Sequence, residues 1–349
     1  MHNSTVITLI LLGVIFASLV LDLGLLSKNS NDEGLSLNQS LKRSAFWFGL
    51  GLSVMMGIYY WIPDLHEITD MNSLQQYVNT HGNTFRITGN YEESLHNFRI
   101  SSAMAYLSGY LLEYALSVDN LFVMLLVFQS FKVSHKNEQR ILVWGVLGAM
   151  VLRFIFIYIG SAAIQRFHWI LFVFGGLLIY SGLKLLFQKE DKEFDPENHG
   201  VMKWVKKMIP VTQLPEDKSH FFIRIDGKLH ATVLFVVLLI VEFTDVVFAI
   251  DSVPAVFGVS TDIYVVFFSN IFAILGLRSL YFLIGFGMDK FYALKYGLSV
   301  ILVYIGIKML FEDFFHRIGF THFHNLLILV GILAVSIFYS LYRPLNDSK

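Results

Sequence analysis

The apolar stretch at residues 229–258, LHATVLFVVLLIVEFTDVVFAIDSVPAVFG, decides what kind of protein this sequence encodes. It is long enough to cross a hydrocarbon core of about 30 Å, which needs about 20 apolar residues of helix. Three carboxylates nevertheless lie inside it: Glu242, Asp245 and Asp251. Because one acid at the centre of a membrane helix costs about 2.5–3.5 kcal/mol, three in one segment predict a function for these groups within the bilayer.

The rest of the chain has the same apolar character. Its 349 residues are 55% hydrophobic and only 15% charged, with 33 Phe and a mean hydropathy of +0.59. This composition excludes a water-soluble fold of this size, a disordered chain and a polar nucleic-acid binder. We predict an all-α polytopic membrane protein with nine transmembrane helices, near residues 5–27, 43–62, 101–131, 140–163, 167–187, 229–258, 263–287, 293–313 and 322–342.

The basic residues outside these spans indicate how the chain is oriented. With the N-terminus outside, 18 Lys and Arg fall on the cytoplasmic side and four on the opposite side, as the positive-inside rule requires. We expect the N-terminus out and the C-terminus in, in the inner (plasma) membrane. Residues 63–100 are then an extracytoplasmic segment, expected to be a solvated loop rather than a small cap. Residues 188–228 are a cytoplasmic loop that ends in a hairpin-like stretch before Asp226-Gly227.

Two parts of the chain resemble each other. Residues 113–120, EYALSVDN, align with residues 245–252, DVVFAIDS, and residues 180–187, YSGLKLLF, align with residues 304–311, YIGIKMLF. Each copy, 101–187 and 229–313, holds three predicted helices, and an odd number inverts the second copy in the membrane. Inverted repeats are typical of secondary transporters, whose sites lie near the bilayer midplane. A gene duplication without transport is the alternative.

Five carboxylates and two arginines lie well inside predicted spans. Unpaired, five acids would cost on the order of 12–18 kcal/mol, and Arg153 and Arg278 can balance two of them. The remaining three negative charges predict a bound divalent cation, protons or both, with structural salt bridges as the alternative. The oxygen donors on these spans suit Mn²⁺, Mg²⁺ or Ca²⁺. They are the carboxylates of Glu113, Asp119, Glu242, Asp245 and Asp251, with Ser117, Asn120, Thr244, Ser252 and Asn270.

A proline bears on how these groups could converge. On a straight helix Glu242 and Asp251 point about 180° apart. Pro254 would clash with the carbonyl of Ile250, and we expect it to break the helix beside Asp251 so that both acids can face one centre. Another acid, Asp22 in the first span, lies near a helix end and is expected to be solvated or to cap the helix.

The sequence carries no enzyme signature. His66-Glu67 is not followed by the second histidine of H-E-x-x-H, and neither G-x-S-x-G nor a P-loop occurs. The chain has no cysteine, which excludes thiolate metal sites and redox chemistry by its own thiols. We expect no enzymatic activity, no covalently bound cofactor and no nucleic-acid partner.

The two acid motifs resemble the signature segments of the TerC integral membrane family. The resemblance rests on residues 112–123 and 241–255, continues through 269–278 and 294–298, and covers about residues 100–313. The family is named for tellurite resistance, and its members have been described as membrane redox modulators and as Mn²⁺ efflux proteins. The resemblance implies that the functional positions are Glu113, Asp119, Asn120, Glu242, Asp245, Asp251 and Ser252.

These inferences predict a secondary transporter that exports divalent metal cations, manganese first among them, by alternating access between the two repeats. Mn²⁺ is the cargo in this prediction and not a resident cofactor. Protons are the candidate coupling ion, and Arg153 and Arg278 would balance the acids when the metal is absent. The alternative function is a non-transporting membrane partner in a stress response or in metal loading, of the tellurite-resistance or redox-modulator type.

Overall fold

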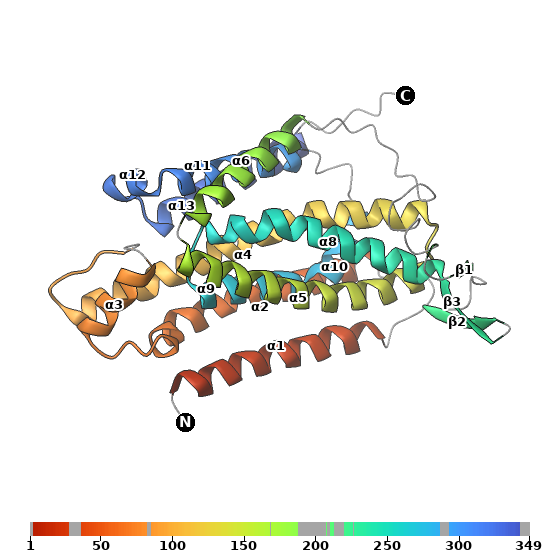
Figure 1. The fold of residues 1–349 in the computed structure, drawn as a ribbon, viewed down its shortest axis with the longest axis horizontal. Coiled ribbons are helices and arrows are strands. Elements are labelled where there is room, and N and C mark those ends of the chain that lie inside the picture. Colours follow the sequence, from red (N-terminus) through yellow and green to blue (C-terminus); the bar gives the residue numbers. More distant parts are fainter. Residues whose placement is uncertain are drawn as a thin grey trace.

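The computed structural model describes residues 3–27, 36–81, 85–167, 169–187, 207, 210–212, 220–225, 227–286 and 293–342. Figure 1 shows long helices lying side by side in one bundle, with α1 along one edge and α6 and α11 along the opposite edge. The helices are α1 (Asn3–Ser27), α2 (Leu37–Leu65), α3 (Met71–His81), α4 (Tyr91–Ser130), α5 (His135–Arg166), α6 (Ile170–Phe187), α8 (Val233–Phe257), α9 (Ile263–Leu275), α10 (Leu277–Gly285), α11 (Leu294–Leu310), α12 (Glu312–Arg317) and α13 (His322–Tyr342).

The helix lengths confirm an all-α polytopic membrane protein. In the described part of the chain seven helices are long and apolar enough to cross a membrane, and α9 with α10 makes an eighth candidate if the bent pair is one span. The remaining predicted span, 293–313, corresponds to α11, whose 17 residues reach only about 26 Å. Nine crossings are therefore a prediction that the helix lengths do not establish.

The helix break lies in a different place from the one predicted. Helix α8 runs unbroken from Val233 to Phe257 with Pro254 inside its last turn, so the predicted break at Pro254 is wrong. Pro254 cannot donate a backbone hydrogen bond to Ile250, but the helix continues past it, since the amide of Gly258 donates to the carbonyl oxygen of Pro254 at 2.9 Å. The chain bends instead by 47° between α9 and α10, at Gly276.

The two ends of the bundle carry different small elements. Figure 1 places α3 and α12 at one end and the short sheet at the other. Residues 63–100 contain α3 and the first turns of α4, so this segment is a helical cap and not the expected loop. The predicted hairpin is present: β2 (Phe222–Ile225) pairs antiparallel with β3 (Lys228–Thr232), and β1 (Val211–Thr212) pairs parallel with β3. Most of the predicted cytoplasmic loop 188–228 lies outside the described residues.

Small residues allow α6 and α11 to pack closely. A side chain at Gly175 would meet the carbonyl oxygen of Gly306 at 3.0 Å, and Ser299 donates a hydrogen bond to the carbonyl oxygen of Gly182 at 2.5 Å. Close helix approach at small residues is the usual way membrane helices associate. In the alignment of residues 180–187 with 304–311, Gly175 corresponds to Ser299 and Gly182 to Gly306, so the two contacts exchange with each other.

Candidate functional site

A buried ion pair between α4 and α5 is linked by a hydrogen bond to α9, in the second half of the chain. Glu113 of α4, which is 0% exposed, pairs with Arg153 of α5, which is 5% exposed. The guanidinium of Arg153 also donates to Asn270 Oδ1 of α9 at 2.8 Å. The amide of Asn270 is held in turn by a 2.9 Å bond to the carbonyl of Val266. Charged groups this deep require partners, and three helices supply them.

Two acids of α8 complete a group that we call the acid cluster: Glu113, Glu242, Asp245 and Arg153. Asp245 interacts electrostatically with Arg153 and with Glu113, and Glu242 interacts with Asp245. The carboxylate of Glu242 rests on Gly148 of α5, where any side chain would collide with it. Glu113 and Asp245 therefore share Arg153, and Glu242 adds a third carboxylate beside Asp245. When all are ionised, the cluster has two negative charges in excess.

Two carboxylate oxygens of the acid cluster lack a hydrogen-bond partner. Among the described residues, neither Glu113 Oε2 nor Asp245 Oδ2 has one, although both atoms are buried. The other Glu113 oxygen accepts from Ser117 at 3.5 Å as well as pairing with Arg153. A buried polar atom without a partner costs about 1–3 kcal/mol, and more if it is charged. This arrangement leaves acceptor oxygens facing the interior with no donor to satisfy them.

The remaining predicted ligands lie in other groups. Asp251 of α8 accepts a 2.6 Å bond from Ser181 of α6 and interacts with Lys184, whereas Asp119 of α4 interacts with Lys295 of α11. Asn120 and Ser252, the residues that follow these acids, are buried beside them. Because α8 stays straight, Glu242 and Asp251 point to opposite sides, as helical geometry requires.

The arrangement does not present a ready-made metal centre. In the described part of the chain, no group of three or more His, Asp or Glu side chains is placed to hold a metal ion. Seven oxygen-bearing residues thus fall into three neighbouring groups instead of one shell. Metal binding here would require the carboxylates to move relative to Arg153.

Arg278 has a partner that the sequence analysis missed. Its guanidinium pairs with Asp22 of α1 at 3.3 Å, and both residues are 2% exposed. The expectation that Asp22 is solvated or caps a helix is therefore wrong. An acid within an otherwise apolar span was the available signal, but its partner lies 256 residues away in the chain, where no spacing rule points. Arg278 balances Asp22 rather than a motif acid.

A second polar group connects the helical cap that contains α3 to the bundle. Asp262, which caps the N-terminus of α9 through the amide of Tyr264 at 2.9 Å, accepts hydrogen bonds from Tyr77 at 2.9 Å and His66 at 2.8 Å. Burial alone would raise the pKa of Asp262, but the neighbouring His66, His81 and Tyr77 lower it to about 2. Burial lowers the pKa of His81. Asp262 therefore stays ionised and holds the α3 cap.

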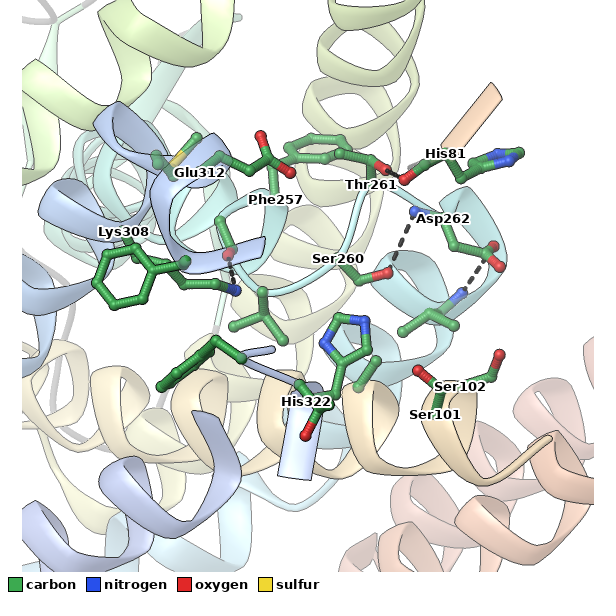
Figure 2. Close-up of a pocket in the computed structure, with 18 of the residues that line it drawn as sticks. His81, Ser101, Ser102, Phe257, Ser260, Thr261, Asp262, Lys308, Glu312 and His322 are labelled. Atoms are coloured by element: carbon green, nitrogen blue, oxygen red, sulfur yellow. Dashed lines mark hydrogen bonds between the residues drawn. The ribbon is translucent and has the colours of Figure 1, made fainter. Parts of the chain in front are cut away.

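This group borders a pocket at the same end of the bundle, which we call the outer pocket. Its volume is about 60 Å³, room for a few water molecules. Figure 2 shows His322 near its centre, with Lys308 and Glu312 to one side and Ser101, Ser102 and Asp262 to the other. Lys308 donates to the carbonyl oxygen of Gly258 at 3.0 Å. The pocket thus lies between α4, the α8–α9 turn, α11, α12 and α13.

A charged group held between packed apolar helices defines the class: this is a polytopic membrane protein, embedded in the lipid bilayer, with its polar site inside the membrane. The chain belongs to the integral membrane protein TerC family, whose sequence profile matches residues 98–347. The match confirms the resemblance seen in the two acid motifs. The acid cluster lies wholly within the matched region, whereas Asp22 lies outside it.

Named relatives support the same family. A relative from Salmonella typhi, "Putative membrane-bound redox modulator Alx", is 50% identical over 61% of this chain and 66% of its own length, just under two thirds. The protein of the same name from Photorhabdus laumondii is 40% identical over 85% of this chain and 83% of its own. An uncharacterized membrane protein from Rickettsia bellii is 36% identical over 95% of both chains. No solved structure matches this chain.

Proposed function

We propose that this protein is a secondary transporter of the inner membrane that exports divalent metal cations, with Mn²⁺ as its main substrate and the acid cluster as its principal ion site. The observation that carries the proposal is the pair of buried oxygens on Glu113 and Asp245 that have no hydrogen-bond partner in the part of the chain that the structure describes. Carboxylate oxygens in a cluster with excess negative charge are the ligands that hard divalent cations prefer.

In this proposal Arg153 and the cation compete for the same carboxylates. Without an ion, Arg153 pairs with Glu113 and is steadied by Asn270. An arriving divalent ion draws Glu113 and Asp245 together and displaces the guanidinium toward Asn270. The two charges of the ion match the two excess negative charges of the cluster, and protons taken up by the acids would balance them after release.

The other predicted ligands are proposed as flanking ion positions. Asp119 and Asn120 follow Glu113 by about 9 Å along α4, and Asp251 and Ser252 follow Asp245 by the same distance along α8. Because α4 and α8 run in opposite directions in the predicted topology, the two pairs lie on opposite sides of the acid cluster. Ions crossing the membrane would then pass one pair on entry and the other on exit.

Exchange of equivalent contacts supports alternating access by the two repeats. In addition to the α6–α11 contacts, Gly160 packs on Phe257 and Gly285 packs on Leu125. Leu125 and Phe257 each lie five residues beyond the aligned segments 113–120 and 245–252, and Gly160 and Gly285 each lie seven residues after an arginine, Arg153 and Arg278. One contact therefore becomes the other when the copies are exchanged. A two-fold relation of this kind gives two conformations of equal architecture that open to opposite sides.

One observation favours the alternative function. The lack, within the described residues, of a group of three metal-ligating side chains is what a non-transporting membrane partner in a stress response or in metal loading would show. Redox modulation, the role in the relatives' name, cannot use thiols of this chain because it has no cysteine.

Total cellular manganese separates the two functions. Manganese-loaded cells expressing the wild type should contain several-fold less metal than cells expressing Asp245→Asn at equal membrane levels. Glu92→Gln, which alters an exposed acid at the start of α4, is the matched control and should behave as the wild type. Equal manganese in all three strains would contradict export and favour the non-transporting partner.

A further inference from the structure

The outer pocket lies close to the acid cluster along one face of α4. Ser101 and Ala105 line the pocket, and Gly109 and Glu113 follow on the same face, because positions four apart in a helix are stacked. Ala105, which lines the pocket, and Glu113 in the cluster are about 12 Å apart along the helix. Gly109 is the small residue between them on this face, and the fully buried Leu112 lies beside it.

Helix α9 supplies the opposite wall of the same interval. Val265 lines the pocket, and Ser269, one turn further, faces Gly109 so closely that a side chain there would meet its hydroxyl oxygen at 2.9 Å. The next residue, Asn270, holds Arg153. Both walls therefore begin at the outer pocket and end at the acid cluster.

The stretch between the outer pocket and the acid cluster is polar at both ends, and between the ends α4 and α9 are in close contact. The deep end has the buried Glu113 oxygen that lacks a hydrogen-bond partner among the described residues, on the same helix face as the pocket. The outer end has the ionised Asp262 and the hydroxyls of Ser101 and Ser102. Among the described residues, the Gly109–Ser269 contact, backed by Val256, is a close approach of α4 to α9 between the two ends.

We propose that the outer pocket is the extracytoplasmic mouth of the cation pathway, and that the Gly109–Ser269 contact between α4 and α9 is its outer gate. Separation of α4 from α9 at this point would connect the acid cluster to the outer pocket along a wall of small and hydroxyl-bearing residues. The contact is closed in this structure, which therefore represents a state shut toward the outside. This inference deepens the proposed export function and rests on it for the identity of the ion.

The absence of cysteine in the sequence allows a direct test by accessibility. Ser101→Cys and Ala105→Cys would each be treated, in intact cells, with a membrane-impermeant cationic methanethiosulfonate. Leu107→Cys is the matched control, because it lies at the same depth on the other side of α4. We expect both pocket variants to be modified at least ten-fold faster than the control, with Ser101→Cys faster than Ala105→Cys.

Manganese content of the same cells gives the second readout. Modification of Ala105→Cys should raise retained manganese several-fold relative to the same variant left unmodified, because the added group plugs the mouth. The pathway would be overturned if the pocket variants were modified no faster than Leu107→Cys, or only from the cytoplasmic side. It would also be overturned if both pocket variants were modified and export stayed intact. Fast modification in a protein whose wild type exports no manganese would refute the proposed function and leave the water-accessible mouth in place.

Discussion

At the scale of single residues, the acid cluster has one cation, Arg153, among three carboxylates. Arg153 binds Glu113 directly and interacts with Asp245. Its positive charge therefore offsets one of the three negative charges of the acid cluster when no metal is bound. Removing one partner of a buried pair is far more costly than removing both, because the survivor stays charged in a medium that cannot solvate it. The variants of this pair should therefore behave in a strongly non-additive way.

Arg153→Leu should lower the free energy of unfolding by about 3–5 kcal/mol, the usual cost of an uncompensated buried charge. The double variant Arg153→Leu with Glu113→Gln should recover much of that loss. Thermal unfolding in detergent measures both, and Arg166→Leu, which removes an exposed arginine from the end of the same helix, is the control. Equal losses in the single and double variants would contradict the pairing.

The outer cap depends on the charge of one buried acid. The pKa of Asp262 is lowered to about 2, so its contribution to cap stability is complete above the ordinary carboxyl pKa near 4 and is lost as the pH falls through 2. The shift corresponds to about 2 kcal/mol. At neutral pH, the α3 amides of Asp262→Asn should be only weakly protected against hydrogen exchange. The wild type should reach such weak protection only near pH 2.

Hydrogen exchange of the α3 amides tests the role of Asp262. Asp70 is the necessary control, because hydrogen bonds from Ser73 also lower its pKa and it precedes the same helix. Asp70→Asn keeps a capping side chain and should leave α3 protected at neutral pH. Loss of protection in both variants, or in neither, would show that Asp262 does not hold the cap.

At the scale of helices, close packing between α6 and α11 depends on glycine. A side chain at Gly306 would press on the backbone of Gly175 and on Ile179, and the two helices would have to separate. Gly306→Val should therefore lower the melting temperature and the amount of protein in the membrane. Gly176→Val, on the same helix pair but with nothing within 4 Å, should do neither, and equal effects of the two variants would contradict the packing.

The helices could be predicted from sequence to different degrees. Long apolar segments such as α8 are placed within a few residues, because length and hydropathy alone decide whether a segment crosses the membrane. The α3 helix was missed because it is short and largely polar, and only Leu74 and Val78 are buried. The break was assigned to Pro254 because proline is a strong local signal, whereas Gly276, where the bend occurs, has no comparable one.

The candidate site shows the same division between local and long-range information. The motif acids were identified because charge within an apolar span is itself the signal, and Glu113 does pair with Arg153 as the balance of charges suggested. Which acids share a group depends on the rotation of each helix against its neighbours. The spacing of Glu242 and Asp251 on α8 already sets them on opposite sides of that helix, but no spacing in the sequence records which neighbouring helix each acid meets.

At the scale of the whole molecule, the count of Lys and Arg predicts that the α3 cap faces outward and the sheet faces the cytoplasm. Figure 1 places these elements at opposite ends of the bundle, which suits that orientation. A phosphatase reporter inserted after His81 should be active outside the cell, and one inserted within residues 188–206 should be inactive. The reverse result would invert the topology and place the outer pocket in the cytoplasm.

The Asp22–Arg278 pair constrains how the chain is made. Helix α1 enters the membrane early, and its acid cannot meet its arginine until a further 256 residues have been synthesised, roughly 10–50 seconds later at ordinary rates of translation. The apolar window of α1, with a mean hydropathy of 2.6, is strong enough to hold the helix in place meanwhile. The ion pair forms late and fixes α1 to the rest of the bundle, so α1 docks fully only when the bent α9–α10 segment has been inserted.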